Sequence, residues 1–177
     1  MPLAKQSKAC NDSAIYSRNV SALPILPALP VRPVRGQMLL LGGIRWDWDG
    51  ILRGPDRYTV RRGVTGLLVG ATSEEAGFEC HTTLEGLAGL FTFARRLLPG
   101  LGEARVEATW AGLRPGTPDD HPLIGYLGDL PVIAATGHYR NGILLAPWTA
   151  RAVAGLVLDG EAPPEARPFT PQRFGGK

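Results

Sequence analysis

Two segments of the 177-residue chain combine residue types that could bind and orient a small anionic substrate. The first is WAGLRPGTPDDHPLIG (residues 110–125) and the second is ATGHYRNGILLAP (residues 135–147). Each places an arginine in a glycine-rich turn after an apolar stretch. The planar fork of donors on an arginine at a strand end suits bidentate binding of a carboxylate. Arg114 is therefore the first candidate for that role, and a surface ion pair is the alternative that spacing alone leaves open.

The second segment could bind a ligand through its backbone. Gly137 and Gly142 would let the backbone approach a ligand closely, and Pro147 suits the first turn of a helix. Backbone donors and a helix amino terminus together stabilise an anion or a polarised oxygen. The alternative is a tight strand-to-helix connection in which the glycines serve only the turn, and the residues by themselves favour this alternative.

Two further patterns limit the chemistry. Asp119, Asp120 and His121 stand before Pro122 and predict a polar turn; their spacing is not that of a metal site, so no metal is predicted. No Gly-x-Gly-x-x-Gly follows a strand and opens a helix in these 177 residues. The βαβ unit that holds a dinucleotide pyrophosphate is therefore not expected among them.

The residues with candidate chemistry must be positioned by short strands. Five segments have strand character: residues 37–41, 57–61, 66–71, 106–113 and 131–135. The second and third are expected to form an antiparallel hairpin through residues 62–65, where Gly63 can take a positive φ. In the fourth, Val106, Ala108 and Trp110 alternate with polar residues, which predicts that these three side chains share the buried face.

Two helices are expected beside these strands. Residues 83–98 carry apolar side chains at helical spacing, and Thr82 with Glu85 matches a capping box. A second helix is expected from Pro147 to Gly160. The resulting fold class is α+β, with a mainly antiparallel sheet and two principal helices.

The composition is that of an ordinary globular domain, with 44% hydrophobic and 20% charged residues. The net charge of +3 is dispersed, so nucleic-acid binding is not expected. No apolar run approaches the roughly 20 residues of a membrane span, and no signal peptide is recognisable. Cys10 and Cys80 form neither a metal spacing nor a dense disulfide pattern, which favours the cytoplasm.

The prolines and polar residues of the first third predict the domain boundaries. Residues 1–21 are expected to be a polar, poorly ordered leader, and residues 22–36, with prolines at every third position in their first part, a connecting segment. Residues 37–174 are expected to form the functional domain. Residues 175–177 are a tail.

The two candidate segments resemble a known pair of motifs. GLRPGTPDDHPLIG with GHYRNGILLAP is similar to the paired signature of the FAD-dependent glycine oxidases of thiamine biosynthesis, within the D-amino-acid oxidase family. Upstream, PVRPVRGQMLLL and LLVGATSEEAGF resemble the strands of that family's substrate domain, and the similarity covers about residues 23–174. The resemblance implies the substrate-binding, flavin-capping part of the D-amino-acid oxidase fold, without its nucleotide-binding half.

The resemblance also implies roles for individual residues. Arg114 would bind the substrate carboxylate, the hydroxyl of Tyr58 would donate to the same carboxylate, and Arg140 would lie near the flavin and the entrance. The residues implied to line the flavin are Gly137, His138, Arg140, Asn141, Gly142, Ile143 and Leu144. No side chain is assigned as a catalytic base, because flavin oxidation of an amine does not require one. One departure lies in the strand after Tyr58, where Thr-Val-Arg-Arg replaces the family's apolar, proline-containing continuation.

The implied activity is FAD-dependent oxidation of the amine of glycine or a small amino acid to an imine, with oxygen reduced to peroxide. The chain is expected to need a nucleotide-binding half, supplied before Met1 or by another chain, and its exposed surface could lead to self-association. The alternatives are a catalytically silent carboxylate-binding fragment and a flavoenzyme for other D-amino or N-methyl amino acids.

Overall fold

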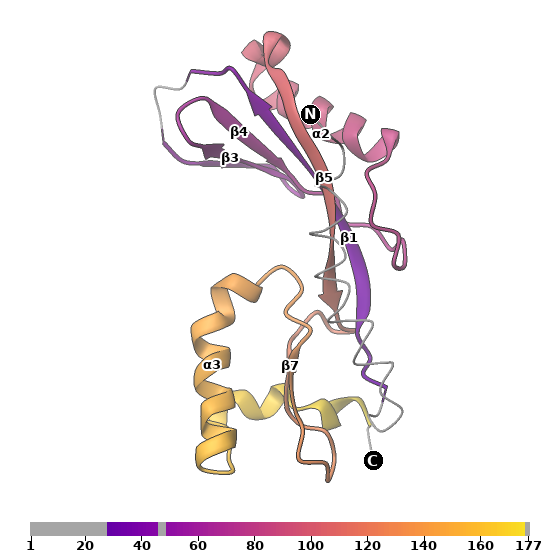
Figure 1. Ribbon diagram of the computed structural model, residues 1–177, viewed down its shortest axis with the longest axis vertical. Helices are drawn as coiled ribbons and strands as arrows, with labels where there is room; N and C mark the ends of the chain where they lie inside the picture. The colour runs from indigo at the N-terminus through magenta and orange to yellow at the C-terminus, as the bar shows by residue number, and fades with distance from the viewer. Residues whose placement is uncertain (1–27, 46–48, 176–177) are drawn as a thin grey trace. The chain divides into compact units, whose positions relative to one another are not determined.

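The computed structural model describes residues 28–45 and 49–175, which divide into two compact units (Figure 1). Unit 1 contains the described residues from 35 to 113, and unit 2 contains residues 28–34 and 114–175. The chain crosses between the units within strands β1 (Arg32–Gly42) and β5 (Arg105–Gly116). The expected leader, residues 1–21, and the first part of the proline-rich segment lie outside the described residues, as does Cys10.

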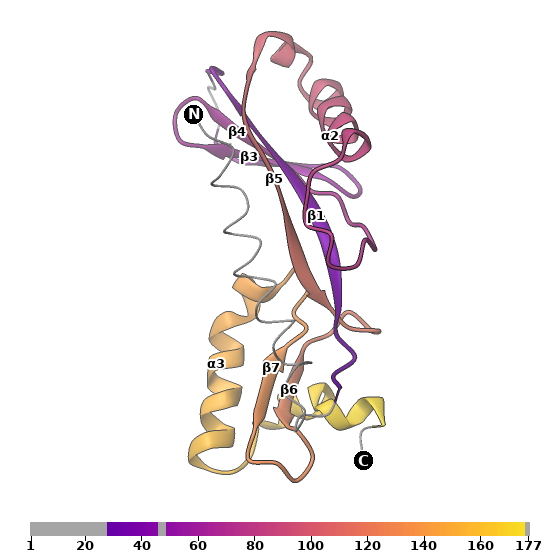
Figure 2. The same cartoon turned by 45° about the vertical axis from the view of Figure 1, so that its right-hand side comes forward.

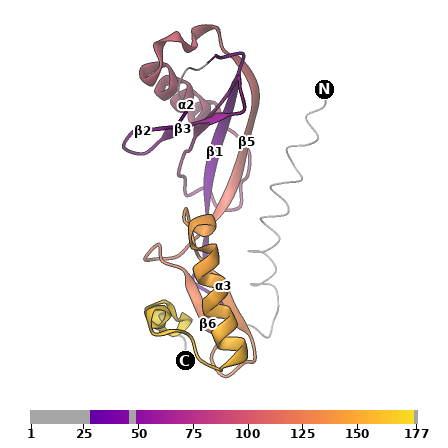
Figure 3. The ribbon, with the colours of Figure 1, turned by 90° about the vertical axis from the view of Figure 1, so that its left-hand side faces the viewer.

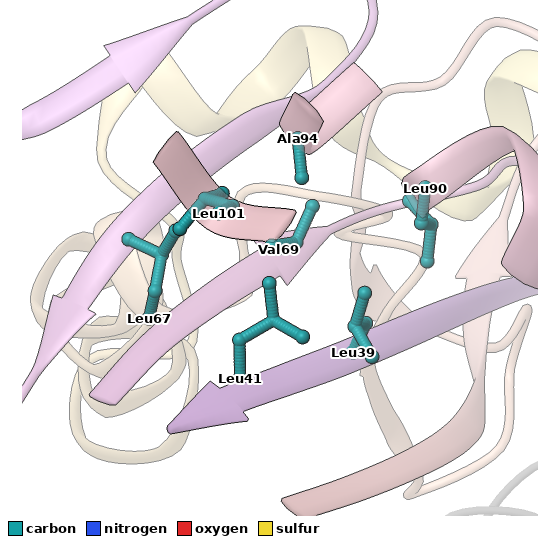
Figure 4. Packing of buried hydrophobic residues seen from close by; sticks show 7 residues of the cluster. All are labelled: Leu39, Leu41, Leu67, Val69, Leu90, Ala94 and Leu101. Carbon is teal, nitrogen blue, oxygen red and sulfur yellow. The ribbon is translucent and has the colours of Figure 1, made fainter. Parts of the chain in front are cut away.

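Unit 1 is built on a five-stranded sheet with the order β2-β3-β4-β1-β5. Its remaining strands are β2 (Ile51–Arg53), β3 (Tyr58–Arg62) and β4 (Gly66–Gly70), and the pairs β2–β3, β3–β4 and β4–β1 are antiparallel. Helix α2 (Leu84–Leu97) and the short 3-10 helix η2 (Pro99–Glu103) follow β4 in the chain. They cover one face of the sheet and bury the cluster shown in Figure 4: Leu39, Leu41, Leu67, Val69, Leu90, Ala94 and Leu101.

The predicted hairpin is confirmed. Arg62 of β3 pairs with Gly66 of β4, and Gly63 in the connecting loop has a φ of +64°. Strand β2 was not predicted, because three residues are too few to show a period of two.

The predicted buried face of β5 is wrong. Val106 is 54% exposed, whereas Ala111 and Leu113, which lie on the other face of the strand, are buried. Alternation along a strand reports that two faces differ, but the neighbouring elements decide which face is covered. Strand β5 lies at the edge of the sheet, and its first three residues are exposed.

Helix α2 is capped by Thr83; the predicted cap, Thr82, is wrong by one residue. The Thr83 hydroxyl accepts a hydrogen bond from the Gly86 N–H at 3.1 Å, and Thr83 has extended backbone angles. Both threonines stand before the apolar stripe, so the local pattern permits either. A hydrogen-bond partner from β1, Gln37, selects Thr83.

Unit 2 is a two-stranded antiparallel sheet packed against one long helix. Strands β6 (Leu123–Tyr126) and β7 (Ile133–Thr136) lie side by side in Figure 2, and helix α3 (Gly142–Leu158) packs against both. Two 3-10 helices end the described chain, η3 (Pro164–Phe169) and η4 (Pro171–Phe174), coloured yellow in Figure 3. The buried cluster of this unit comprises Ile124, Ala152, Leu156 and Ala166.

Helix α3 begins five residues before the predicted start at Pro147. The Leu145 N–H donates to the Asn141 carbonyl at 2.8 Å, which closes a turn upstream of the proline. Pro147 removes only the bond that its own N–H would have donated to the carbonyl of Ile143. Proline is compatible with a helix start, but here it lies in the second turn.

The α+β class, with a mainly antiparallel sheet and two principal helices among the described residues, is confirmed. Within that part of the chain, no helix combines the length and apolar character needed to cross a membrane.

Candidate functional site

Arg114 lies near the end of β5, where the chain enters unit 2, and its side chain is half-buried. Two residues later the strand ends and a turn of residues 117–122 begins. The base of this arginine is therefore fixed by strand backbone, as the sequence predicts.

Tyr58 begins β3 and lies opposite Gly70 of β4. A Cβ atom at position 70 would lie 2.6 Å from the Met38 sulfur and 3.2 Å from the Tyr58 Cζ. Gly70 therefore leaves room for both side chains. Because Val69 is part of the core beneath α2, the alternating Gly70 and its neighbours belong to the opposite face of the sheet. Tyr58 belongs to unit 1 and Arg114 to unit 2, so their joint role stays a prediction.

The loop after β7 is held against the end of β5. Gly137 is buried with a φ of +76°, and a Cβ atom there would lie 2.6 Å from the Thr117 Cγ2. The Tyr139 N–H donates to the Pro115 carbonyl at 3.0 Å. The two segments that the sequence singles out are thus in direct contact within unit 2, and the residue after Arg114 is itself a partner of the loop.

His138 and Arg140 of this loop have different surroundings. The His138 Nε2 lies 2.9 Å from the Thr149 Oγ1 on α3, and burial lowers the pKa of His138 below its ordinary value. Burial therefore disfavours the charged imidazole, and the ring is hydrogen-bonded to the helix. Arg140 is exposed, and its guanidinium carbon lies 5.3 Å from the centre of the Tyr139 ring.

The first turn of α3 presents backbone donors and apolar side chains to the surface. The N–H groups of a first helical turn have no partners within the helix, and Asn141 makes no side-chain capping bond here. Ile143 is 96% exposed and Leu144 is 78% exposed. Around Gly142 the nearest atom to an added Cβ would be the His138 Cβ at 3.7 Å, an ordinary contact. This surface suits a planar ligand that is partly apolar and carries an electron-rich edge.

A sequence model of the DAO family, described as FAD dependent oxidoreductase, matches residues 12–156. The chain belongs to this family. Similar proteins include bifunctional protein ThiO/ThiG of Synechocystis sp., 43% identical over 97% of this chain, and glycine oxidase of Pseudomonas putida, 38% identical over 79% of it. The crystal structure of glycine oxidase from Geobacillus kaustophilus matches 82% of this chain with a TM-score of 0.73 and 32% identity. The resemblance seen in the sequence is confirmed.

The DAO-family chain spans less than half of the length of these relatives. It covers 27% of the ThiO/ThiG protein, 39% of the Pseudomonas putida glycine oxidase and 40% of the Geobacillus kaustophilus chain.

The sequence did not predict the ion pair between Arg173 and Asp119. Arg173 of η4 donates from Nε to the Asp119 Oδ2 at 2.9 Å and from Nη2 to Oδ1 at 3.0 Å. Hydrogen bonds from Arg173 hold the pKa of Asp119 far below its usual range. The polar turn expected around His121 is observed, and the Asp120 N–H closes it by donating to the Thr117 carbonyl. Among the described residues, no group of three or more His, Cys, Asp or Glu side chains is placed to hold a metal ion. No local pattern links two residues so far apart in the sequence.

Proposed function

We propose that this chain is the substrate-binding and flavin-capping part of an FAD-dependent oxidase for glycine or another small amino acid. Membership of the DAO family and the glycine oxidases among the relatives support this assignment. The observation that carries it is the first turn of α3. Its apolar side chains are exposed, and an added Cβ at Gly142 would meet only the His138 Cβ at an ordinary 3.7 Å, while the loop before it is packed tightly at Gly137.

The fit of a flavin to this surface follows from the donors present. The backbone N–H groups of Gly142, Ile143 and Leu144 would face the electron-rich pyrimidine edge, and the helix amino terminus would stabilise negative charge there. The exposed side chains of Ile143 and Leu144 would be covered by the bound group. Of the other predicted contacts, Gly137, His138, Arg140 and Asn141 belong to the loop that leads into this turn. Bound FAD would supply the two-electron oxidation of the substrate amine, with oxygen as the final acceptor.

The substrate would be oriented by Arg114 and Tyr58. The guanidinium would bind the carboxylate through two parallel hydrogen bonds, and the tyrosine hydroxyl would donate a third. Such positioning lowers a barrier by roughly 7–11 kcal/mol where the geometry is good. Burial disfavours a positive charge on His138, whose ring is hydrogen-bonded to Thr149, and we assign no general base. On this proposal residues 37–174 act together in the cytoplasm with a nucleotide-binding half.

The test joins this chain to the part of Pseudomonas putida glycine oxidase that it does not match. We expect the fusion to retain yellow flavin through gel filtration and to form peroxide with glycine. The chain by itself should bind FAD weakly or not at all, since the pyrophosphate-binding unit supplies much of dinucleotide affinity. D-Alanine and sarcosine, tested beside glycine, separate a glycine oxidase from an enzyme for other D-amino or N-methyl amino acids. A folded fusion that binds no flavin would overturn the proposal and favour a silent carboxylate-binding fragment.

A further inference from the structure

Arg173 uses all three of its guanidinium nitrogens on one short turn and its own helix. Beyond the two bonds to Asp119, Nη1 donates to the Pro122 carbonyl and Nη2 to the His121 carbonyl, each at 2.9 Å. A weaker bond runs from Nη1 to the Thr170 carbonyl at 3.3 Å. The Arg173 side chain is only 16% exposed. A largely covered guanidinium with five acceptors makes more bonds than a surface ion pair requires.

The turn of residues 117–122, to which Arg173 is bonded, contains a left-handed residue and is also bonded internally to the Asp119 carboxylate. Asp120 has a φ of +56°, and its N–H donates to the Thr117 carbonyl at 3.2 Å. The His121 N–H donates to the Asp119 Oδ1 at 3.1 Å. The Thr117 hydroxyl lies 2.7 Å from the His121 carbonyl and 3.1 Å from the Asp119 Oδ1, so it donates to one or the other. Asp120, the residue with the left-handed backbone, thus lies between Asp119 and His121, which are hydrogen-bonded to each other.

The loop of residues 137–141 packs against this turn at Gly137. The three atoms nearest to a Cβ at Gly137 would be the Thr117 Cγ2 at 2.6 Å, the Leu123 N at 3.4 Å and the His121 carbonyl oxygen at 3.6 Å. Thr117 and His121 therefore lie within hydrogen-bond distance of the Asp119 carboxylate and also beside Gly137. Because the packing at Gly137 is tight, a shift of the turn toward the loop would displace the loop.

We infer that Arg173 and Asp119 are positioning residues that set the place of the loop of residues 137–141 by holding the turn of residues 117–122. The importance of that place rests on the proposed function, in which the loop leads into the flavin-facing turn of α3. Helix η4 then positions the loop indirectly, through the turn of residues 117–122.

The test measures amide hydrogen exchange on the 177-residue chain without flavin. The variants are Arg173→Ala, Arg173→Lys and Asp119→Asn, and peptides covering residues 137–146 report on the loop. We expect exchange there to rise by about tenfold or more in Arg173→Ala, while β6 and α2 keep their protection. Arg173→Lys should restore less than half of the effect, because a point charge cannot reach two carboxylate oxygens and two carbonyls together.

Arg151→Ala is the matched control. Arg151 pairs with Glu165 at 2.6 Å in the same unit, and both side chains are exposed. Its loss should leave exchange at residues 137–146 unchanged. Asp119→Asn combined with Arg173→Ala should add little to either change alone, because both break one network.

Two outcomes would overturn the inference. One is wild-type exchange at residues 137–146 in all three variants. The other is an equal rise in β6, β7 and the loop, which would mean that the pair only stabilises unit 2 as a whole. Because flavin is absent from this measurement, a failure of the flavin assignment leaves a positive result standing. A negative result here likewise leaves flavin binding by the fusion untouched.

Discussion

Gln37 and Thr83 exchange two reciprocal hydrogen bonds between β1 and the start of α2. The Gln37 Nε2 donates to the Thr83 Oγ1 at 2.9 Å, and the Thr83 N–H donates to the Gln37 Oε1 at 2.8 Å. Gln37 is fully buried, and its Nε2 also donates to the Glu74 Oε1 at 2.8 Å. A Cβ at Gly86 would lie 2.2 Å from this amide, so the helix approaches the strand closely at that point. The pair fixes where α2 begins on the sheet.

Replacement of Gln37 by Leu should destabilise the chain by roughly 2–3 kcal/mol, because the Thr83 N–H and a Glu74 oxygen lose their buried partner. Thr83→Ala should cost about 1 kcal/mol through loss of the cap. The neighbouring Thr82→Ala is the control and should change stability by less than about 0.5 kcal/mol. Urea unfolding measures all three, and a larger cost for Thr82 than for Thr83 would contradict the observed cap.

Glu74 should make the stability of the chain depend on pH in the acid range. Burial acts to raise the pKa of Glu74, but hydrogen bonds from Thr72, Arg35 and Gln37 outweigh it, and the pKa lies below its ordinary value. A lowered folded pKa stabilises fully above the unfolded value, about 4.3, and this contribution is lost as the pH falls through the folded pKa. Glu74→Gln should therefore cost roughly 1–2 kcal/mol at pH 7 and much less near pH 3.

Unfolding midpoints measured between pH 3 and 7 check this expectation. The exposed Glu103 supplies the control, since Glu103→Gln should leave the pH profile of wild type unchanged. A Glu74→Gln variant that remains equally destabilised at both ends of the range would show that the carboxylate charge is not what matters.

Gly137 and Gly142 should respond in opposite ways to the same substitution. Gly137→Ala adds a side chain at a positive φ and against the Thr117 methyl, so it should cost about 1–3 kcal/mol. Gly142→Ala makes only an ordinary contact, 3.7 Å from the His138 Cβ, in the first turn of a helix and should be neutral or stabilising by up to about 1 kcal/mol. If the flavin lies beside Gly142, Gly142→Ala or the larger Gly142→Val should nevertheless weaken flavin binding by the fusion.

Thermal unfolding of the isolated chain and flavin titration of the fusion separate these effects. A Gly142 variant with normal stability and normal flavin affinity would show that Gly142 serves only the strand-to-helix connection and does not contact the flavin.

Arg114→Ala in the fusion should raise the Michaelis constant for glycine by roughly 100-fold, because the carboxylate loses charge-assisted hydrogen bonds. Arg114→Lys should recover little of this, and Tyr58→Phe should have a smaller effect of about tenfold. Arg105 lies on the same strand with its side chain 77% exposed, so Arg105→Ala is the control and should leave the kinetics unchanged. Unaltered glycine kinetics in Arg114→Ala would remove this arginine from the site.

Local patterns in the sequence predicted the elements whose structure depends on near neighbours. The hairpin through Gly63 follows from one residue that tolerates a positive φ, and α2 from an apolar stripe with helical spacing. These features depend on backbone preferences and on hydrogen bonds within a few residues, which the sequence displays directly. The contact between the two motif segments, in which the Tyr139 N–H donates to the Pro115 carbonyl, was not among these predictions.

Contacts between distant residues decided the rest. The cap at Thr83 depends on Gln37 from another strand, the buried face of β5 depends on which elements cover the sheet, and the shape of the turn at Asp119 depends on Arg173, 54 residues later. A sequence pattern indicates which positions can be buried or hydrogen-bonded. A contact between distant residues contributes to stability only after the fold has brought the two partners together. The sequence therefore determined the family, the principal elements and the candidate residues, and the tertiary structure determined how those residues are held.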